Sequence, residues 1–412
     1  MGIKLSTEGR SWDELKTAMM HLRRDDVDWR HGRHGAYVWY VSEDLERVAR
    51  EAYGMFMAEN GLGPRAFPSL RQMEEEVVGI TLSLLQGEDG AGQMTSGGTE
   101  SVFLAAKAAR DWARAQRPEI TNPEVVAPFS AHPAINKAAH YLGLRVIRVP
   151  TGPDFRADVQ AMSRAITPNT IMLYASAPAY SLGVIDPIAA IGELAEKRGH
   201  WFHVDACVGG ILGPFVRRLG YPVPIFDFSL PGVSSISADH HKSGYTAKGA
   251  STVLFRNSDL QKYSRYEFDD WPTGLYSNLT FTGTRPGGAI AAAWAVMNFL
   301  GEKGYLKIAE TVMRARQRFE EGLTKISGFH VWGHPDLWAI AFGAEGYDIL
   351  EVWKTMVARG WFLSPVRRPP GIHLMVTAVH ELAIDECIAE LKDAVARVRE
   401  GQVTGSTAEA RY

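Results

Sequence analysis

The middle of the chain alternates short apolar runs with longer stretches in which apolar residues recur at helical spacing. The short runs predict strands and the longer stretches predict helices. Strands separated by helices of this length are typical of a mostly parallel α/β sheet covered on both faces. The predicted strands are Val125–Ala127, Arg145–Val149, Ile171–Ala175, Trp201–Val204, Ser234–Ser237 and Thr252–Phe255. The predicted helices are Glu100–Ala115, Ala134–Leu142, Val159–Ile166 and Pro187–Arg198.

The two flanking parts of the chain follow other patterns. The start is rich in Arg and His and predicts helices and loops, followed by an amphipathic helix at Glu74–Leu85. After the Ala-rich helix Gly287–Leu300 the pattern predicts a smaller α+β domain. Its elements are Ala309–Ile326, Phe329–Trp332, Leu337–Phe342, Ile349–Arg359, Ile372–Val376 and a last helix from about Ala383 to Arg399. We therefore expect an N-terminal segment (1–60), a large domain (61–300), a small domain (301–400) and a polar tail (401–412).

Composition narrows the class of protein. The 412 residues are 46% hydrophobic and 22% charged, with a formal net charge of −3. Mixed charges argue against a nucleic-acid partner, and the longest apolar stretch, Ala289–Leu300, is too short to span a bilayer. The two cysteines, Cys207 and Cys387, have no metal or redox spacing. We therefore expect a cytoplasmic protein with neither a membrane anchor nor a metal site.

A lysine and an aspartate each follow a predicted strand. Lys242 lies in the run Ser-Ala-Asp-His-His-Lys, and Asp205 follows Trp201–Val204. Pyridoxal phosphate needs an amine for its aldehyde and a carboxylate for its pyridine nitrogen. We expect burial or the neighbouring His241 to lower the pKa of Lys242 and make it nucleophilic. Taken singly, the two residues also fit a surface lysine and a capping aspartate. Together they predict a pyridoxal phosphate site.

Two further features fit the same cofactor. Gly97-Gly98-Thr99 precedes a strong helical pattern, and a helix start with close backbone approach is a credible cradle for a phosphate. His132 follows a predicted strand, where a flat imidazole could stack on the pyridine ring. Each feature is weak by itself, because many helices begin with Gly-Thr or with a polar residue.

In this order, these motifs resemble the pyridoxal-dependent group II decarboxylase family and, within it, the sphingosine-1-phosphate lyases. The likeness is good over about residues 30–300. The runs that carry it are Thr95–Ser101, Glu124–Pro128, Ser130–His132, Asn136–Ala139, Gly183–Pro187, His203–Cys207, Ser235–Asp239, Lys242–Gly249 and Gly283–Gly287.

The resemblance implies the α/β architecture of fold-type I, like aspartate aminotransferase, and a homodimer with its sites at the interface. It implies that Lys242 is the cofactor lysine, Asp205 the pyridine partner and His132 the stacking residue. By position, the residues that would hold the cofactor phosphate are Gly98, Thr99, His241 and, from the other subunit, Thr284. Those that would serve the substrate are Tyr180 as an acid or base, and Lys248 and Tyr37 at its phosphate.

One segment departs from the lyase pattern. The lyases have His-Pro-Asp before Phe-Pro-Ser, whereas this chain has Gly63-Pro64-Arg65 and then Ala66. Arg65 could bind the anion in place of the missing His, because a guanidinium suits phosphate and carboxylate alike. It could equally recognise a different substrate. His240, where the lyases have Thr, also changes the pocket wall.

The sequence thus predicts a lyase that cuts a phosphorylated 2-amino-3-hydroxy substrate between C2 and C3. An amino-acid decarboxylase is the alternative, because the same electron sink serves both reactions. A non-catalytic protein that kept the fold is a third reading. It would be favoured by loss of Lys242 or Asp205, and both are present.

Overall fold

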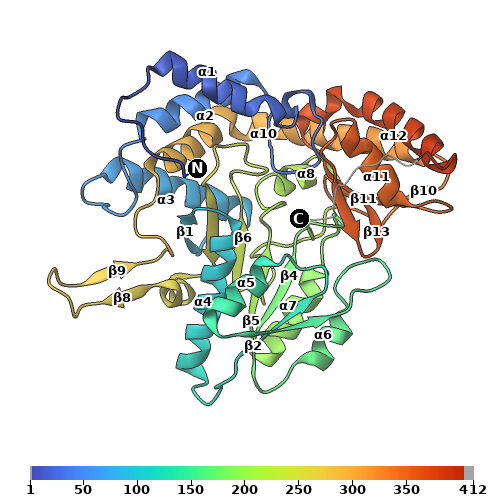
Figure 1. Cartoon of the computed structure of the whole chain (residues 1–412). Coiled ribbons are helices and arrows are strands. Elements are labelled where there is room, and N and C mark those ends of the chain that lie inside the picture. The colour runs from blue at the N-terminus through green and yellow to red at the C-terminus, as the bar shows by residue number, and fades with distance from the viewer. Residues whose placement is uncertain (1, 403–412) are drawn as a thin grey trace.

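The computed structural model describes residues 2–402, and a seven-stranded sheet forms its centre (Figure 1). The strands lie in the order β1-β7-β6-β5-β4-β2-β3, and β7 alone runs against its neighbours in this described sheet. Their bounds are β1 Ala91–Thr95, β2 Glu124–Pro128, β3 Arg145–Val149, β4 Thr170–Ser176, β5 Trp201–Asp205, β6 Ser235–Ala238 and β7 Ser251–Phe255. The predicted, mostly parallel sheet is confirmed.

Helices pack on both faces of this sheet. They are α4 Gly98–Gln116, α5 Ala134–Leu142, α6 Val159–Ala165, α7 Ile188–Arg198 and α8 Gly213–Arg218. Successive strand residues point to opposite faces, so Trp201 packs on the side of α4 and α5 while Phe202 joins the core on the other side. Trp201 is 1% exposed, and burial this complete contributes about 3 kcal/mol. Both faces of the sheet are therefore covered, as the sequence predicts.

A second sheet follows near the C-terminus, antiparallel and ordered β10-β11-β13-β12. Its strands and helices are β10 Phe329–Val331, β11 Ala339–Ala344, α11 Ile349–Ala358, β12 Ser364–Arg367, β13 Pro370–Met375 and α12 Ile384–Arg399. The long helix α10, Gly287–Thr324, lies beside α2 (Glu43–Met55) and reaches this second sheet (Figure 1). It bends at Gly301, whose φ of 54° and ψ of −172° are not helical. Gly301 falls at the proposed boundary between the large and small domains.

The remaining elements lie around this frame. They are α1 Trp12–Leu22, α3 Pro68–Leu84, α9 Ser258–Gln261 and the hairpin strands β8 Tyr266–Phe268 and β9 Tyr276–Asn278. The hairpin extends away from the body of the molecule (Figure 1). No helix among residues 2–402 is long and apolar enough to cross a membrane. Most of the predicted polar tail, residues 403–412, lies outside the described residues.

The sequence prediction differs from the structure in a few elements. Strand β1 and the β8–β9 hairpin were not predicted, because Ala-Gly-Gln-Met-Thr has no apolar run and the β8 side chains are exposed. The two helices predicted at 287–300 and 309–326 are joined into α10 across the bend at Gly301. Helix α3 begins at Pro68, six residues before the predicted start, because proline is well suited to the first helical turn.

Candidate active site

The candidate site is a cavity of about 350 Å³ at the carboxyl ends of the sheet strands, beside the first turn of α4. The residues that line it follow β1, β2, β4, β5 and β6, because parallel strands bring their carboxyl ends to one edge of the sheet. Seven of the predicted site residues line this one cavity: Gly98, Thr99, His132, Tyr180, Asp205, His241 and Lys242.

Lys242 is held by a carboxylate that the sequence analysis did not assign to the site. Its Nζ lies 2.9 Å from Oδ2 of Asp239, and the same oxygen lies 3.6 Å from Nε2 of His241. Burial acts to lower the pKa of Lys242, but the combined electrostatic interactions with Asp239, Cys207 and Asp205, with Asp239 first among them, outweigh burial and raise the pKa above its ordinary value. The expectation of a lowered pKa is therefore wrong for the chain by itself, because the acidic groups around the amine favour its protonated form more strongly than burial disfavours it.

Asp205 ends β5 and is 8% exposed. It accepts hydrogen bonds from Tyr174 Oη at 2.5 Å, Cys207 N at 3.1 Å and Ser237 Oγ at 3.3 Å. Burial acts to raise the pKa of Asp205, but the electrostatic interaction with His132, the hydrogen bonds from Tyr174 and Cys207, and the charge of Lys242 together outweigh burial and lower the pKa. The carboxylate therefore stays ionised, which is the state needed beside a protonated ring nitrogen.

Three aromatic rings form a row, and two of them, His132 and Tyr180, line the cavity. His132 Nδ1 accepts from Ala134 N at 3.2 Å, which places the ring proton on Nε2. Its ring centre lies 6.1 Å from that of Tyr180, which in turn lies 4.7 Å from that of His373. Burial lowers the pKa of His132 below its ordinary value and that of His373 to about 4, so both rings are neutral near pH 7. Since His373 belongs to β13, the second sheet contacts Tyr180, which lines the cavity.

The glycine turn before α4 leaves no room for a side chain. A Cβ on Gly98 would lie 2.6 Å from Cys207 Sγ and 2.9 Å from Asp239 Oδ2. Glu100 fixes this turn by accepting from Ser96 N at 2.7 Å and Ser96 Oγ at 2.5 Å. A helix start at a bare backbone turn offers N–H groups and a positive dipole end to an anion.

The residues around the cavity fit pyridoxal phosphate. An ionised carboxylate, an amine, a flat neutral imidazole and an anion-binding helix start line the same space. These are the groups that its ring nitrogen, aldehyde, ring face and phosphate require.

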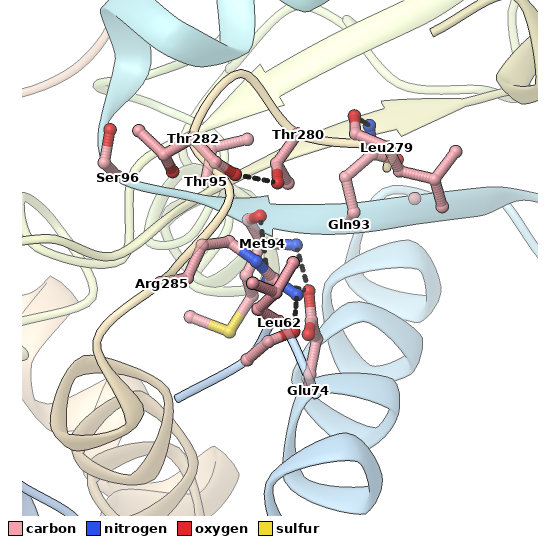
Figure 2. A network of polar contacts seen from close by, with 12 residues as sticks. Leu62, Glu74, Gln93, Met94, Thr95, Ser96, Leu279, Thr280, Thr282 and Arg285 are labelled. Atoms are coloured by element: carbon pink, nitrogen blue, oxygen red, sulfur yellow. Dashed lines mark hydrogen bonds and ion pairs between the residues drawn. The ribbon is translucent and has the colours of Figure 1, made fainter. Parts of the chain in front are cut away.

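A buried ion pair supports the strand that leads into the glycine turn. Figure 2 shows the carboxylate of Glu74 on α3 in contact with both Met94 of β1 and Arg285. Glu74 Oε1 accepts from Met94 N at 2.9 Å and lies 2.5 Å from Arg285 Nη1. Arg285 Nη2 donates to Gly61 O at 3.0 Å. One guanidinium thus joins three segments of the chain that are far apart in sequence.

The loop 279–286 is fixed to the same strand and to α4. Gln93 Nε2 donates to Leu279 O at 3.0 Å, and Phe281 N donates to Glu100 Oε1 at 2.9 Å. Because Glu100 also holds Ser96, the loop and the glycine turn share one carboxylate. Thr284, at the end of this loop, is exposed.

Four predicted site residues do not line the cavity within one copy of the described chain. Thr284 and Arg65 are exposed, and Tyr37, with a left-handed φ of 71°, packs on Phe362. Lys248 Nζ donates to His241 O at 3.0 Å and lies 4.7 Å from the Trp39 ring centre. Burial and the charge of Lys242 lower the pKa of Lys248 to about 8.

Sequence reasoning missed several residues at the site. Asp239 contacts Lys242, Tyr174 and Ser237 donate to Asp205, and His373 contacts Tyr180. Asp239 alone gave a usable signal, since it follows a strand as Asp205 does. The other three are ordinary strand residues in the sequence.

A family profile described as the pyridoxal-dependent decarboxylase conserved domain matches residues 48–345. The chain belongs to this family. It is 42% identical to the sphingosine-1-phosphate lyase of Arabidopsis thaliana, over 96% of this chain and 74% of that protein. It is 34% identical to the L-aspartate/L-glutamate decarboxylase of Pyrococcus horikoshii, over 84% of this chain and 88% of that protein.

A solved structure of one of these lyases has the same fold as this chain. The sphingosine-1-phosphate lyase of Burkholderia pseudomallei K96243 superposes with a TM-score of 0.93 at 34% identity, covering 98% of this chain and 94% of that one. The predicted fold-type I α/β architecture is therefore confirmed, and so is the dependence of the family on pyridoxal phosphate.

Proposed function

We propose that this chain is a pyridoxal phosphate-dependent aldehyde-lyase that cuts the C2–C3 bond of a phosphorylated 2-amino-3-hydroxy, sphingoid-base-like substrate. The products are an aldehyde and phosphoethanolamine. The observation that carries the proposal is the meeting of Lys242, Asp205, His132 and Tyr180 around one cavity. Identity of 42% to a sphingosine-1-phosphate lyase over nearly the whole chain supports this substrate class.

When bound, pyridoxal phosphate supplies an electron sink at the substrate C2. Asp205, kept ionised by three hydrogen bonds, would hold the proton of the ring nitrogen, and Lys242 would hold the aldehyde. His132 would cover the ring face. The phosphate would be held by Gly98, Thr99 and His241, which lie at the start of α4 and next to Lys242.

Cleavage requires a base at the C3 hydroxyl. Tyr180 lines the cavity between His132 and His373, and we assign it or a group beside it to this step. The base takes the hydroxyl proton, C3 becomes the aldehyde carbonyl, and the electron pair of the broken bond stays at C2. A proton delivered to C2 then completes phosphoethanolamine.

The substrate phosphate would be bound by Lys248, Tyr37 and Arg65. These residues and Thr284 lie outside the cavity of one chain, which supports a homodimer whose partner completes each site.

The hairpin region presents large exposed apolar side chains, which is unusual for a surface that faces only water and supports the same homodimer. They are Tyr266 (56% exposed), Phe268 (46%), Trp271 (45%), Leu275 (65%) and Phe281 (66%). The cytoplasmic location stays a prediction.

Product analysis tests the proposal. The protein loaded with pyridoxal phosphate is incubated with phosphorylated dihydrosphingosine. Long-chain aldehyde and phosphoethanolamine are the expected products. Release of carbon dioxide from acidic amino acids, with no aldehyde from the phosphorylated base, would instead establish the decarboxylase alternative. The 34% identity to an aspartate/glutamate decarboxylase makes those amino acids the right comparison.

A further inference from the structure

A second cavity of about 340 Å³ adjoins the first. His132 and Tyr180 line both cavities, so the two spaces meet at the residues placed beside the reacting carbon. The second cavity lies between the loop that follows β2 and the strands β12 and β13 of the small sheet. Its apolar walls come from Phe129, Pro133, Pro365 and Val366.

We propose that this second cavity binds the apolar arm of the substrate beyond C3, the part that leaves as the aldehyde. The inference rests on the proposed lyase function. In that reaction C3 must lie against the base, so the chain attached to C3 begins beside Tyr180. A space that opens at Tyr180 and continues between apolar side chains is where this chain can extend without exposure to water.

The base of the cavity is uncharged despite its histidine. His373 is 1% exposed, contacts Tyr180, and has a pKa lowered by burial to about 4. The two charged residues that line this second cavity are Arg367 and Arg368, and their side chains are exposed at the end away from His373. The guanidinium carbon of Arg368 lies 5.4 Å from the Phe129 ring centre. Arginine stems can cover an apolar chain while the guanidinium stays in water. This arrangement suits an alkyl arm that enters at the neutral end and emerges between the arginines.

Another apolar cavity is the main rival for the arm. It has a volume of about 440 Å³ and lies between α2 and residues 245–247, with Val38, Tyr40 and Val41 in its wall. Among the described residues it shares no lining residue with the active-site cavity. An arm attached to C3 would have to leave the site before it could reach this space.

A chain-length series tests the proposal by binding, without turnover. The probes are phosphorylated 2-aminoalkan-1-ols that lack the 3-hydroxyl, with about four to about ten carbons, titrated calorimetrically into the holoenzyme. Each added methylene buried in the cavity should lower Kd about fourfold. Ser364→Trp places a bulky side chain in the cavity from a half-buried position on β12. It should abolish this gain and leave the shortest probe within about twofold of wild type.

Val41→Trp is the matched control, since it fills the rival cavity from an equally half-buried position. This variant should show the same fall in Kd with each added methylene as the wild type does. The proposal is overturned if Kd does not change with chain length in the wild type. It is also overturned if the fall in Kd with chain length is lost in Val41→Trp and kept in Ser364→Trp. A loss of discrimination between phosphorylated and unphosphorylated probes in Arg368→Gln also overturns it, because the cavity would then bind the phosphate. Failure of the lyase function looks different, since the series would behave as expected while the 3-hydroxy substrate released no aldehyde.

Discussion

Oδ2 of Asp239 lies 2.9 Å from Nζ of Lys242, and the Asp239 side chain is 1% exposed. The carboxylate favours the protonated amine, so in the proposed reaction the same residue would both stabilise the lysine and restrain its reactivity. Asp239 is therefore a positioning residue for Lys242.

Asp239→Asn removes that charge and lets burial lower the pKa of Lys242. In the apoprotein, modification of Lys242 by trinitrobenzenesulfonate, followed by mass spectrometry, should then begin at lower pH. The free energy of unfolding should fall by about 3 kcal/mol, the lower end for a broken buried pair, because part of Lys242 is exposed. Asp259→Asn, beside the exposed Lys262, is the control and should change neither quantity. An unchanged modification profile in Asp239→Asn would refute this role.

Gly98→Ala should weaken cofactor binding, because the new Cβ would lie 2.6 Å from Cys207 Sγ and 2.9 Å from Asp239 Oδ2. Overpacking of this kind costs about 1–3 kcal/mol, which corresponds to a rise of about fivefold to about a hundredfold in the Kd for pyridoxal phosphate. Quenching of protein fluorescence measures the Kd. Gly54→Ala in α2, where a Cβ would meet nothing within 4 Å, should bind the cofactor as wild type does. Equal affinity in both variants would show that the turn tolerates a side chain.

Glu74→Gln should loosen the segments joined by Arg285. Both side chains are largely buried, at 16% and 14% exposure, so the uncompensated guanidinium should cost about 3 kcal/mol of unfolding free energy. Hydrogen exchange should quicken at Met94 N and in residues 279–286. The control is Glu75→Gln, which breaks the exposed pair with Arg71 (62% and 63%) and should cost less than about 0.5 kcal/mol. Wild-type exchange in Glu74→Gln would mean that the loop is held without this pair.

His203 should make stability depend on pH. Its ring nitrogens lie 2.9 and 3.2 Å from the hydroxyls of Ser235 and Ser237, and burial lowers its pKa from 6.5 to about 4. Between these values the unfolded chain binds a proton that the folded chain does not, so stability is lost as pH falls from about 6.5 toward about 4. The loss attributable to this group reaches about 3 kcal/mol.

Urea unfolding at about pH 7 and about pH 5 measures this dependence. His203→Gln should reduce the loss of stability between these pH values by about 2 kcal/mol, and the remaining dependence comes from other buried histidines such as His373. His31→Gln, at a side chain 78% exposed, should leave it as in the wild type. If His203→Gln retained the wild-type slope, the loss would have to come from other groups.

The sheet was predictable because its strands are buried on both faces and read as apolar runs, as β4 and β5 do. That Lys242 and Asp205 line one cavity was predictable because both follow such strands, and parallel strands bring their ends together. Asp239 was harder to assign, because a carboxylate after a strand can equally be a simple cap. His373 could not be placed at all, since its role depends on how the second sheet packs against the first. The positions of Thr284, Tyr37 and Arg65 relative to a partner's site remain predictions.

The wall that joins His132, Tyr180 and His373 is built from two sheets whose sequences are about two hundred residues apart. The cofactor end of the site therefore depends on one stretch of the chain, and the fit of the leaving group depends on another. Substitutions between Ser364 and His373 can retune which chain lengths are accepted while the residues around Lys242 stay as they are. In the proposed arrangement, selectivity for the leaving group and reactivity at C2 can therefore change independently of each other.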